Sequence, residues 1–441
     1  NIEVGTISAG KDVEINQQGD LTINEIVKAG NNVTIDGEGS ILQAADKETK
    51  PSVSAGNNIN LTSRKEDIGA KDNFLTVDFG GELDVESTQG SAYIEGMGAL
   101  KADDVKAALD LGLRTPEDIV ADKVSAGRDL ILESGKNVEI NVAEAGRDVN
   151  VKAEETLKVT DIKAGEDIRL ESGEDMTIVD LKANKDAEIV SGGKVKVENL
   201  LEAGEDLKVE ATKDIEQKGQ EVAFKSGKDM TLESKEANVG QPENYLSVEV
   251  GGKLDAEAEK GGVYINGNEE LTVGTITAGK DVEVEAGKIL QDKAETSEGI
   301  QAGEDVTLKA TTGDIGTTES DVKVAAGGEL NAEAKADGAN VNIETKGDIE
   351  VGKIEAAKDV TIANGADIVI NDIVKGGNDV TIAGEGSILQ AADKANKPAV
   401  SAGKDMTLVS NREDVGAGDN YLSVEVGGEL EASAPNGDVY I

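Results

Sequence analysis

The sequence predicts an all-β protein, a parallel β-solenoid in which short strands stack coil upon coil. Three observations predict it. A unit of Ala, Gly, a polar pair ending in Asp or Asn, and an apolar–polar–apolar run recurs throughout the 441 residues, first at 8–15. Between Gly127 and Gly204 the unit returns every 19 or 20 residues. Apolar and polar residues alternate within each run, which is typical of strands with one buried face.

The inward positions of these runs hold Val, Ile and Leu. One coil cannot bury such a face alone, so we expect each coil to stack on both neighbours, as repeat arrays do. The β alternation, with glycine every eight to eleven residues, excludes an amphipathic helical repeat. The predicted core pairs are Val13/Ile15, Val33/Ile35, Ile59/Leu61, Leu130/Leu132, Val149/Val151, Ile168/Leu170, Leu207/Val209, Val282/Val284 and Val380/Ile382.

Composition excludes several classes of function. The formal net charge of −45 argues against nucleic acid or an anionic membrane as a partner, because both need basic patches. The chain has no Cys and no His, so disulfides and the usual zinc and copper ligand sets are excluded. No apolar run is long enough to predict a membrane-spanning helix. The sequence opens and closes inside the repeat pattern, and we expect it to be part of a longer polypeptide.

A longer duplication organises the coils. Residues 1–94 align with 348–441 at a constant offset of 347 without a gap. An intermediate copy ends at Tyr264-Ile265. We therefore expect super-repeats at 1–94, 125–265 and 266–441, all in one continuous rod. Because the glycine spacing widens to 25 or 26 in places, coils of about 19–26 residues are expected, with loops leaving the rod at 43–51 and 390–398.

Residues 95–124 interrupt the pattern and predict a short helical insertion. Asp103 is suited to cap a helix over 104–111 that Gly112 ends. Thr115-Pro116 is a typical start for a second short helix. The insertion is interpreted as a structural excursion, with a docking element as the alternative.

The Asp of the repeat is the first candidate for chemistry, since carboxylates stacked coil after coil are suited to calcium. Turn chemistry is the alternative: an Asp after a glycine turn accepts hydrogen bonds from nearby backbone N–H groups. Asn32 and Asn58 occupy the same position without a charge, which favours turn chemistry. No metal or cofactor is therefore predicted, calcium being the one ion left open. The column comprises Asp12, Asp129, Asp148, Asp167, Asp281, Asp305, Asp359 and Asp405.

Acidic residues and outward threonines suggest two further functions, glycoside cleavage and ice binding. Glycoside cleavage needs two facing carboxylates, yet no acidic pair departs from the repeat and no His or Trp accompanies one, so we expect no enzyme and assign no catalytic residue. Outward threonines are typical of ice-binding faces, but charged residues interrupt their column, which favours a solvated β-face. They are Thr34, Thr177, Thr231, Thr307, Thr361, Thr381 and Thr407.

Six aromatic residues recur at matching positions of the super-repeats. We interpret them as core fillers where the coil widens, because large rings bury much apolar area. Exposed binding platforms are the alternative interpretation. They are Phe74, Tyr93, Tyr245, Tyr264, Tyr421 and Tyr440.

At units such as Ala145-Gly146-Arg147-Asp148-Val149, the sequence resembles the haemagglutinin-repeat region of filamentous-haemagglutinin-like exoproteins, which include adhesins and contact-dependent-inhibition stalks. The resemblance covers nearly all of the chain except 95–124. It implies a right-handed parallel β-helix, export by two-partner secretion, and a location outside the cell or on a bacterial surface. The residues show neither a secretion domain nor a toxin tip.

These observations leave three hypotheses for function. The first is a structural adhesin shaft that displays binding loops or carries a distal binding or toxin module, its cell-surface or matrix ligand unknown. The second is a self-assembling filament or surface-layer subunit, since solenoid ends expose strand edges that pair with other chains. The third, a β-helix enzyme that degrades polysaccharides, has the least support. Neither nucleic acid nor membrane insertion is expected.

Overall fold

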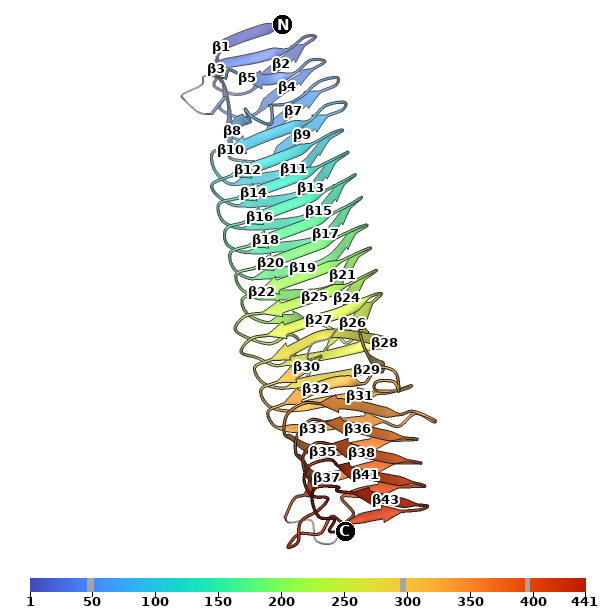
Figure 1. Cartoon of the computed structure of the whole chain (residues 1–441). Coiled ribbons are helices and arrows are strands. Elements are labelled where there is room, and N and C mark those ends of the chain that lie inside the picture. Colours follow the sequence, from blue (N-terminus) through green and yellow to red (C-terminus); the bar gives the residue numbers. More distant parts are fainter. Residues whose placement is uncertain (46–50, 294–298, 393–396) are drawn as a thin grey trace. The chain divides into compact units, whose positions relative to one another are not determined.

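The computed structural model describes residues 1–45, 51–293, 299–392 and 397–441, and across these ranges all regular structure is β strand. The chain folds into two compact units, residues 1–211 and 212–441. Each unit is a parallel β-solenoid whose strands are labelled in chain order in Figure 1. No helix that could span a membrane occurs in these ranges.

The described part of the first unit, residues 1–45 and 51–211, holds 22 strands. Their bounds are β1 Ile2–Ala9, β2 Val13–Gln17, β3 Leu21–Ala29, β4 Val33–Gly37, β5 Ile41–Gln43, β6 Val53–Ala55, β7 Ile59–Ser63, β8 Leu75–Phe79, β9 Leu83–Ser87, β10 Ala92–Gly96, β11 Leu100–Ala107, β12 Leu111–Thr115, β13 Ile119–Ala126, β14 Leu130–Ser134, β15 Val138–Ala145, β16 Val149–Ala153, β17 Leu157–Ala164, β18 Ile168–Ser172, β19 Met176–Ala183, β20 Ala187–Ser191, β21 Val195–Ala203 and β22 Leu207–Ala211.

The described part of the second unit holds the remaining strands. Their bounds are β23 Ile215–Gln217, β24 Phe224–Ser226, β25 Met230–Ser234, β26 Leu246–Val250, β27 Lys253–Ala258, β28 Val263–Ala278, β29 Val282–Gln291, β30 Ile300–Ala302, β31 Val306–Ala310, β32 Val322–Ala326, β33 Glu329–Ala334, β34 Val341–Thr345, β35 Ile349–Ala356, β36 Val360–Asn364, β37 Ile368–Gly376, β38 Val380–Gly384, β39 Ile388–Gln390, β40 Val400–Ala402, β41 Met406–Ser410, β42 Val424–Val426 and β43 Leu430–Ser433.

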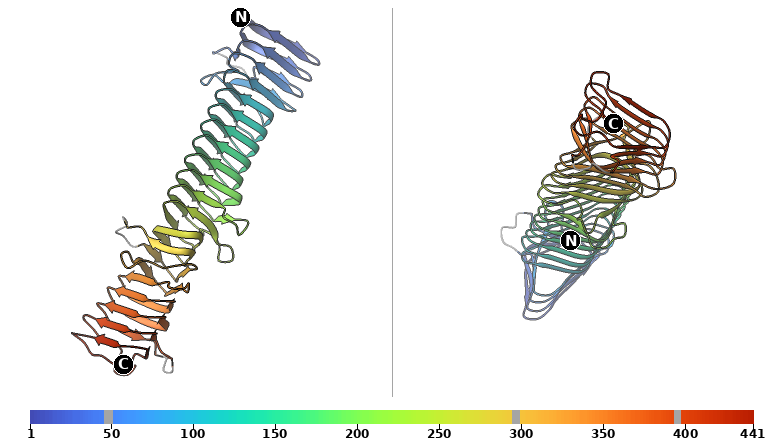
Figure 2. Two further views of the ribbon diagram at one scale, coloured as in Figure 1. Left: turned by 90° about the vertical axis from the view of Figure 1, so that its right-hand side faces the viewer. Right: turned by 90° about the horizontal axis from the view of Figure 1, so that it is seen from below.

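Strands pair in parallel with the strands one coil before and one coil after. In the middle of the first unit, β12, β14, β16 and β18 form one face and β11, β13, β15 and β17 the other, so each coil contributes one strand to each face. Paired residues are 19 apart at Leu130 and Val149, and 26 apart at Val33 and Ile59. The left view of Figure 2 shows the strands of this unit, blue to green, following one another coil by coil. The predicted parallel β-solenoid is confirmed, and its right-handed sense stays a prediction.

The space between the two faces is the core. Of the predicted inward residues, all but one are buried; Val13 is 7% exposed and most others are 0% or 1% exposed. Ile15, in the first coils, is only half-buried. The inward column therefore follows from the alternation of the sequence, because successive side chains of a strand point to opposite sides.

The helical insertion predicted at 95–124 is wrong, because this segment contains β11, β12 and β13. Leu111 pairs with Leu130 and Ile119 with Val138, so 107–125 is an ordinary 19-residue coil. Asp103 lies exposed within β11 and caps no helix. The repeat was hidden because Ala108 and Pro116 stand where later coils have turn glycines. Stacking between two neighbouring coils overrides the local helix signals.

The predicted domains differ from the compact units, whose boundary at 211/212 falls inside the super-repeat assigned to 125–265. The super-repeats at 1–94 and 266–441 stay features of the sequence. Of the predicted loops at 43–51 and 390–398, residues 46–50 and 393–396 lie outside the described residues.

Leu170→Ala tests the stacked core. Leu170 is fully buried between the faces, so its truncation should cost about 2–5 kcal/mol. The adjacent Arg169 is exposed and pairs with Glu188, so Arg169→Ala should change stability by less than about 1 kcal/mol. Urea unfolding followed by circular dichroism compares the two. Equal effects at both positions would contradict the inward and outward assignment.

Candidate functional site

The recurrent Asp forms a ladder of hydrogen bonds between coils. Its Oδ1 accepts the backbone N–H of the residue at the same position one coil later. The Asp148 acceptor lies 3.4 Å from the Asp167 nitrogen, and the Asp167 acceptor lies 3.2 Å from the Asp186 nitrogen. The same bond joins Asp12 to Asn32, Asp281 to Asp305, Asp305 to Glu329, Asp359 to Asp379 and Asp405 to Glu429.

This ladder explains why Asp and Asn interchange. Asn32 Oδ1 accepts from Asn58 N at 3.2 Å, and Asn58 Oδ1 accepts from Glu82 N at 3.0 Å. Only one acceptor oxygen is needed, and either side chain supplies it. The turn interpretation is therefore right about the acceptor role, but the donor lies one coil away and not in the same turn.

Arginines modify the ladder in the first unit. Arg128 donates to both carboxylate oxygens of Asp110, at 2.6 and 2.5 Å. Arg147 pairs in the same way with Asp129. The Arg128 guanidinium holds the pKa of the Asp110 carboxyl below its ordinary value, and the N–H of Asn32 does the same for the pKa of Asp12.

The ladder disfavours a calcium site in the Asp column. Neighbouring carboxylates stand one coil apart, and all but that of Asp129, which Arg147 binds, direct an oxygen at a backbone N–H. Among the described residues, no group of three or more Asp, Glu, His or Cys side chains could hold a metal ion.

The structure reveals a second recurrent device, which we call the clamp loop: residues 69–75, 240–246, 316–322 and 416–422. Each starts with a glycine of positive φ, at Gly69, Gly240, Gly316 or Gly416. Two residues of each loop then form an antiparallel bridge, for example Ala70 with Asn73. Three of these segments carry one of the recurrent aromatic residues noted in the sequence, whereas 316–322 carries none and was missed.

Glutamines hold three of the clamp loops, two through both side chain and main chain and the third through its main-chain carbonyl. Gln43 Nε2 donates to Asn73 Oδ1 at 2.9 Å, and Asn73 Nδ2 donates back to the Gln43 carbonyl oxygen at 3.0 Å. Gln390 and Asn420 repeat both bonds, and Asn244 donates to the carbonyl oxygen of Gln217. Sequence reasoning missed these residues, although a Gln stands two residues after an Ile before every clamp loop.

The aromatic residues pack in pairs beside the clamp loops. Ring centroids are 5.4 Å apart for Phe74 and Tyr93, 6.1 Å for Tyr245 and Tyr264, and 5.9 Å for Tyr421 and Tyr440. Tyr93 is 7% exposed but lies between the inward residues Ala92 and Ile94, so it points away from the core.

Tyr93 therefore lies outside the core, and the first ring pair is neither a core filler nor an open platform. A Cβ on Gly112 would lie 2.8 Å from Tyr93 Cδ1 and 3.2 Å from Phe74 Cζ, so this glycine makes room for the rings. Tyr421, 58% exposed, is the most open ring. Burial raises the pKa of Tyr93 to about 12, which leaves its hydroxyl as a donor to Asp110 at 3.1 Å.

The first ring pair is covered by an arginine. The Arg114 guanidinium carbon lies 4.0 Å from the Phe74 ring centroid, a cation–π contact. Arg114 Nη2 also lies 2.9 Å from Glu95 Oε2. Glu95 and Arg114 are register partners on β10 and β12, so the sheet places them side by side.

Of the outward threonines, only Thr361, Thr381 and Thr407 stack on one another in register. Thr177 pairs with lysines on both sides and Thr34 lies beside Glu14. A continuous threonine face is therefore absent from the described strands that carry these residues.

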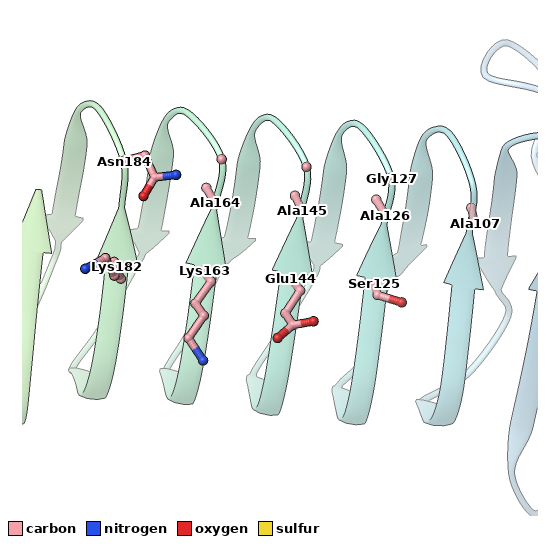
Figure 3. Close-up of a pocket in the computed structure, with 12 residues that line it drawn as sticks. Ala107, Ser125, Ala126, Gly127, Glu144, Ala145, Lys163, Ala164, Lys182 and Asn184 are labelled. Carbon is pink, nitrogen blue, oxygen red and sulfur yellow. The ribbon is translucent and has the colours of Figure 1, made fainter. Parts of the chain in front are cut away.

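A groove of about 640 Å³ follows the turns of the first unit. Figure 3 shows Ser125, Glu144, Lys163 and Lys182 in one row on successive strands. Lys163 pairs with Asp161 at 2.8 Å and Lys182 with Glu202 at 2.9 Å, so these cations are already matched. The floor consists of small residues, among them Ala126, Ala145 and Ala164.

No family model, curated protein or solved structure matches this chain. The resemblance to haemagglutinin-repeat exoproteins therefore serves as a proposal, and the assignment of a function starts from the ladders, clamp loops and surfaces described above.

Asp167 is the position at which to test the ladder. Asp167→Asn keeps the acceptor oxygen and should leave stability unchanged. Asp167→Ala removes it and leaves the Asp186 N–H without its partner, which should cost about 1 kcal/mol. The midpoints of urea unfolding distinguish the two variants. A loss of stability in the Asn variant would show that the charge, and not the acceptor, is what matters.

Calcium should not stabilise the protein. A bound ion raises stability by mass action, by about 2.7 kcal/mol at a hundred times its Kd. Because the ladder uses the carboxylates for backbone donors, we expect the same melting temperature in calcium and in a chelator. A clear upward shift in calcium would contradict this expectation.

Gly240→Ala tests the clamp loop. A Cβ there would lie 2.2 Å from the Tyr264 carbonyl oxygen, and the φ of +79° disfavours any side chain. The cost should be about 2–4 kcal/mol, with faster hydrogen exchange at the Tyr264 amide, which donates to Val239 O. Gly347→Ala is the matched control, because nothing lies within 4 Å of its Cβ position. Similar effects of both variants would count against strain at Gly240.

Proposed function

We propose that the chain is a rigid structural segment of an extracellular bacterial adhesive protein, an elongated shaft that displays binding surfaces. The observation that carries the proposal is the continuity of the coil-to-coil bonding within each unit. Inward apolar columns, parallel strand pairing and the Asp ladder all act between neighbouring coils. Such nearest-neighbour stacking favours growth along one axis.

The surface chemistry supports a display role. The backbone frame repeats, whereas outward positions vary from coil to coil between charged, threonine and aromatic residues. Clamp loops add four equivalent places at which surface residues differ while the loop geometry is kept. The net charge of −45 favours solubility of a long exposed surface. Export and the bacterial surface location rest on the resemblance to haemagglutinin-repeat exoproteins.

Small-angle scattering tests the shaft. About twenty coils at about 4.8 Å each give a length near 100 Å and a radius of gyration of about 30 Å. A compact globule of this chain length would have a radius of gyration of about 22 Å. The lower value would overturn the proposal. Scattering mass that grows with concentration would favour a self-assembling filament, and turnover on a polysaccharide panel would favour an enzyme.

A further inference from the structure

The clamp loops at 69–75 and 316–322 can be compared residue by residue. Their glycines have φ of +69° and +66°, and each glycine Cβ position faces the carbonyl oxygen of Tyr93 or Asn342. Tyr93 and Asn342 are therefore equivalent, and so are Glu95 and Glu344, two residues further along each strand. In the following coils, Arg114 pairs with Glu95 and Ala363 pairs with Glu344.

The regions beside these two clamp loops differ in the side chains that occupy them. In the first, Phe74, Tyr93 and Arg114 pack together, and the guanidinium lies against Glu95. In the second, the same positions hold three smaller residues, Asp321, Asn342 and Ala363. Glu344 is kept: Ala363 replaces the arginine on one side of it, and Lys323 is its register partner on the other side.

A hollow of about 380 Å³ lies at the second place. Asp321 and Glu344 line it, and Ala363 and Ala383 form part of its floor. Thr345 also lines it; this residue is 3% exposed, and its Oγ1 has no hydrogen-bond partner among the described residues. The hollow thus presents two carboxylates, whereas the Thr345 hydroxyl is buried beneath its surface.

Among the described residues no ion pair involves Asp321 or Glu344, although Lys323 is the register partner of Glu344. At the far end Glu385 already pairs with Arg412, at 2.7 Å. Lys346 lines the hollow but makes no ion pair in the described structure. Burial, and then the neighbouring Glu344, raise the pKa of Asp321, as expected for a carboxyl without a counter-ion.

We propose that the hollow beside Glu344 binds the guanidinium group of an arginine side chain supplied by a protein partner. The chain contains the pattern for this binding at Glu95, where its own Arg114 occupies the equivalent position. A planar guanidinium suits the site better than an ammonium, because it donates two parallel bonds to one carboxylate. The site does not depend on the structural role proposed above.

The test uses acetyl-arginine-methylamide as the probe and the methyl NMR signals of Ala363 and Ala383 as the readout. We expect saturable shifts with the arginine probe and none with its citrulline analogue, which keeps the shape but lacks the charge. Glu344→Gln should weaken binding about tenfold or more. Asp337→Asn, which removes an exposed charge outside the hollow, should leave binding unchanged.

Two substitutions, one beside each of the two clamp loops, complete the test. Ala363→Arg should fill the hollow with the chain's own guanidinium and abolish probe binding. Arg114→Ala should create a new probe site beside Glu95, detected at the methyl of Thr115, which lines the groove there. Equal binding of citrulline, unchanged affinity in Glu344→Gln, or no new site in Arg114→Ala would each overturn the proposal. None of these outcomes bears on the radius of gyration, so the two proposals fail separately.

Discussion

Each coil must provide hydrogen-bond partners for the backbone N–H and C=O groups of the next, and the rest of the structure depends on this constraint. Parallel pairing satisfies the strands, and the Asp ladder serves an N–H at the turn, where strand pairing ends. The same closeness restricts side chains: a Cβ on Gly146 would lie 2.1 Å from the carbonyl oxygen of Gly127. Small residues at the turn, an acceptor after it and alternating apolar residues are three results of one stacking distance.

The sequence was sufficient to predict the solenoid and nearly all of its core, because strand alternation depends on adjacent residues. It misled where residue identity changed but backbone geometry did not: Ala108 and Pro116 replace turn glycines, and 107–125 still forms a coil. Contacts between side chains that are distant in the sequence could not be predicted from it. Gln43 and Asn73 are 30 residues apart, and the hollow beside Glu344 depends on a side chain that Ala363 lacks.

The clamp loops show how such a fold changes its surface without changing its frame. Positive-φ glycines and antiparallel bridges recur in all four loops, while the residues packed against them range from a Phe–Tyr pair to Asp321 and Asn342. Inward residues and turns carry the stability, so outward positions are free to vary. Binding chemistry can therefore arise by substitution at one coil, with no effect on coils further along the unit.

The parallel pairing of each coil with its two neighbours also determines how either unit would respond to force. A pull along the stacking direction loads the contacts between coils in series, so each contact carries the same tension, and the end coil, which pairs with one neighbour only, detaches first. One 19-residue coil then releases about 60 Å of extended chain, which lowers the tension before the next coil gives way. The repeat that builds the fold thus also makes each unit extensible under force in steps of one coil.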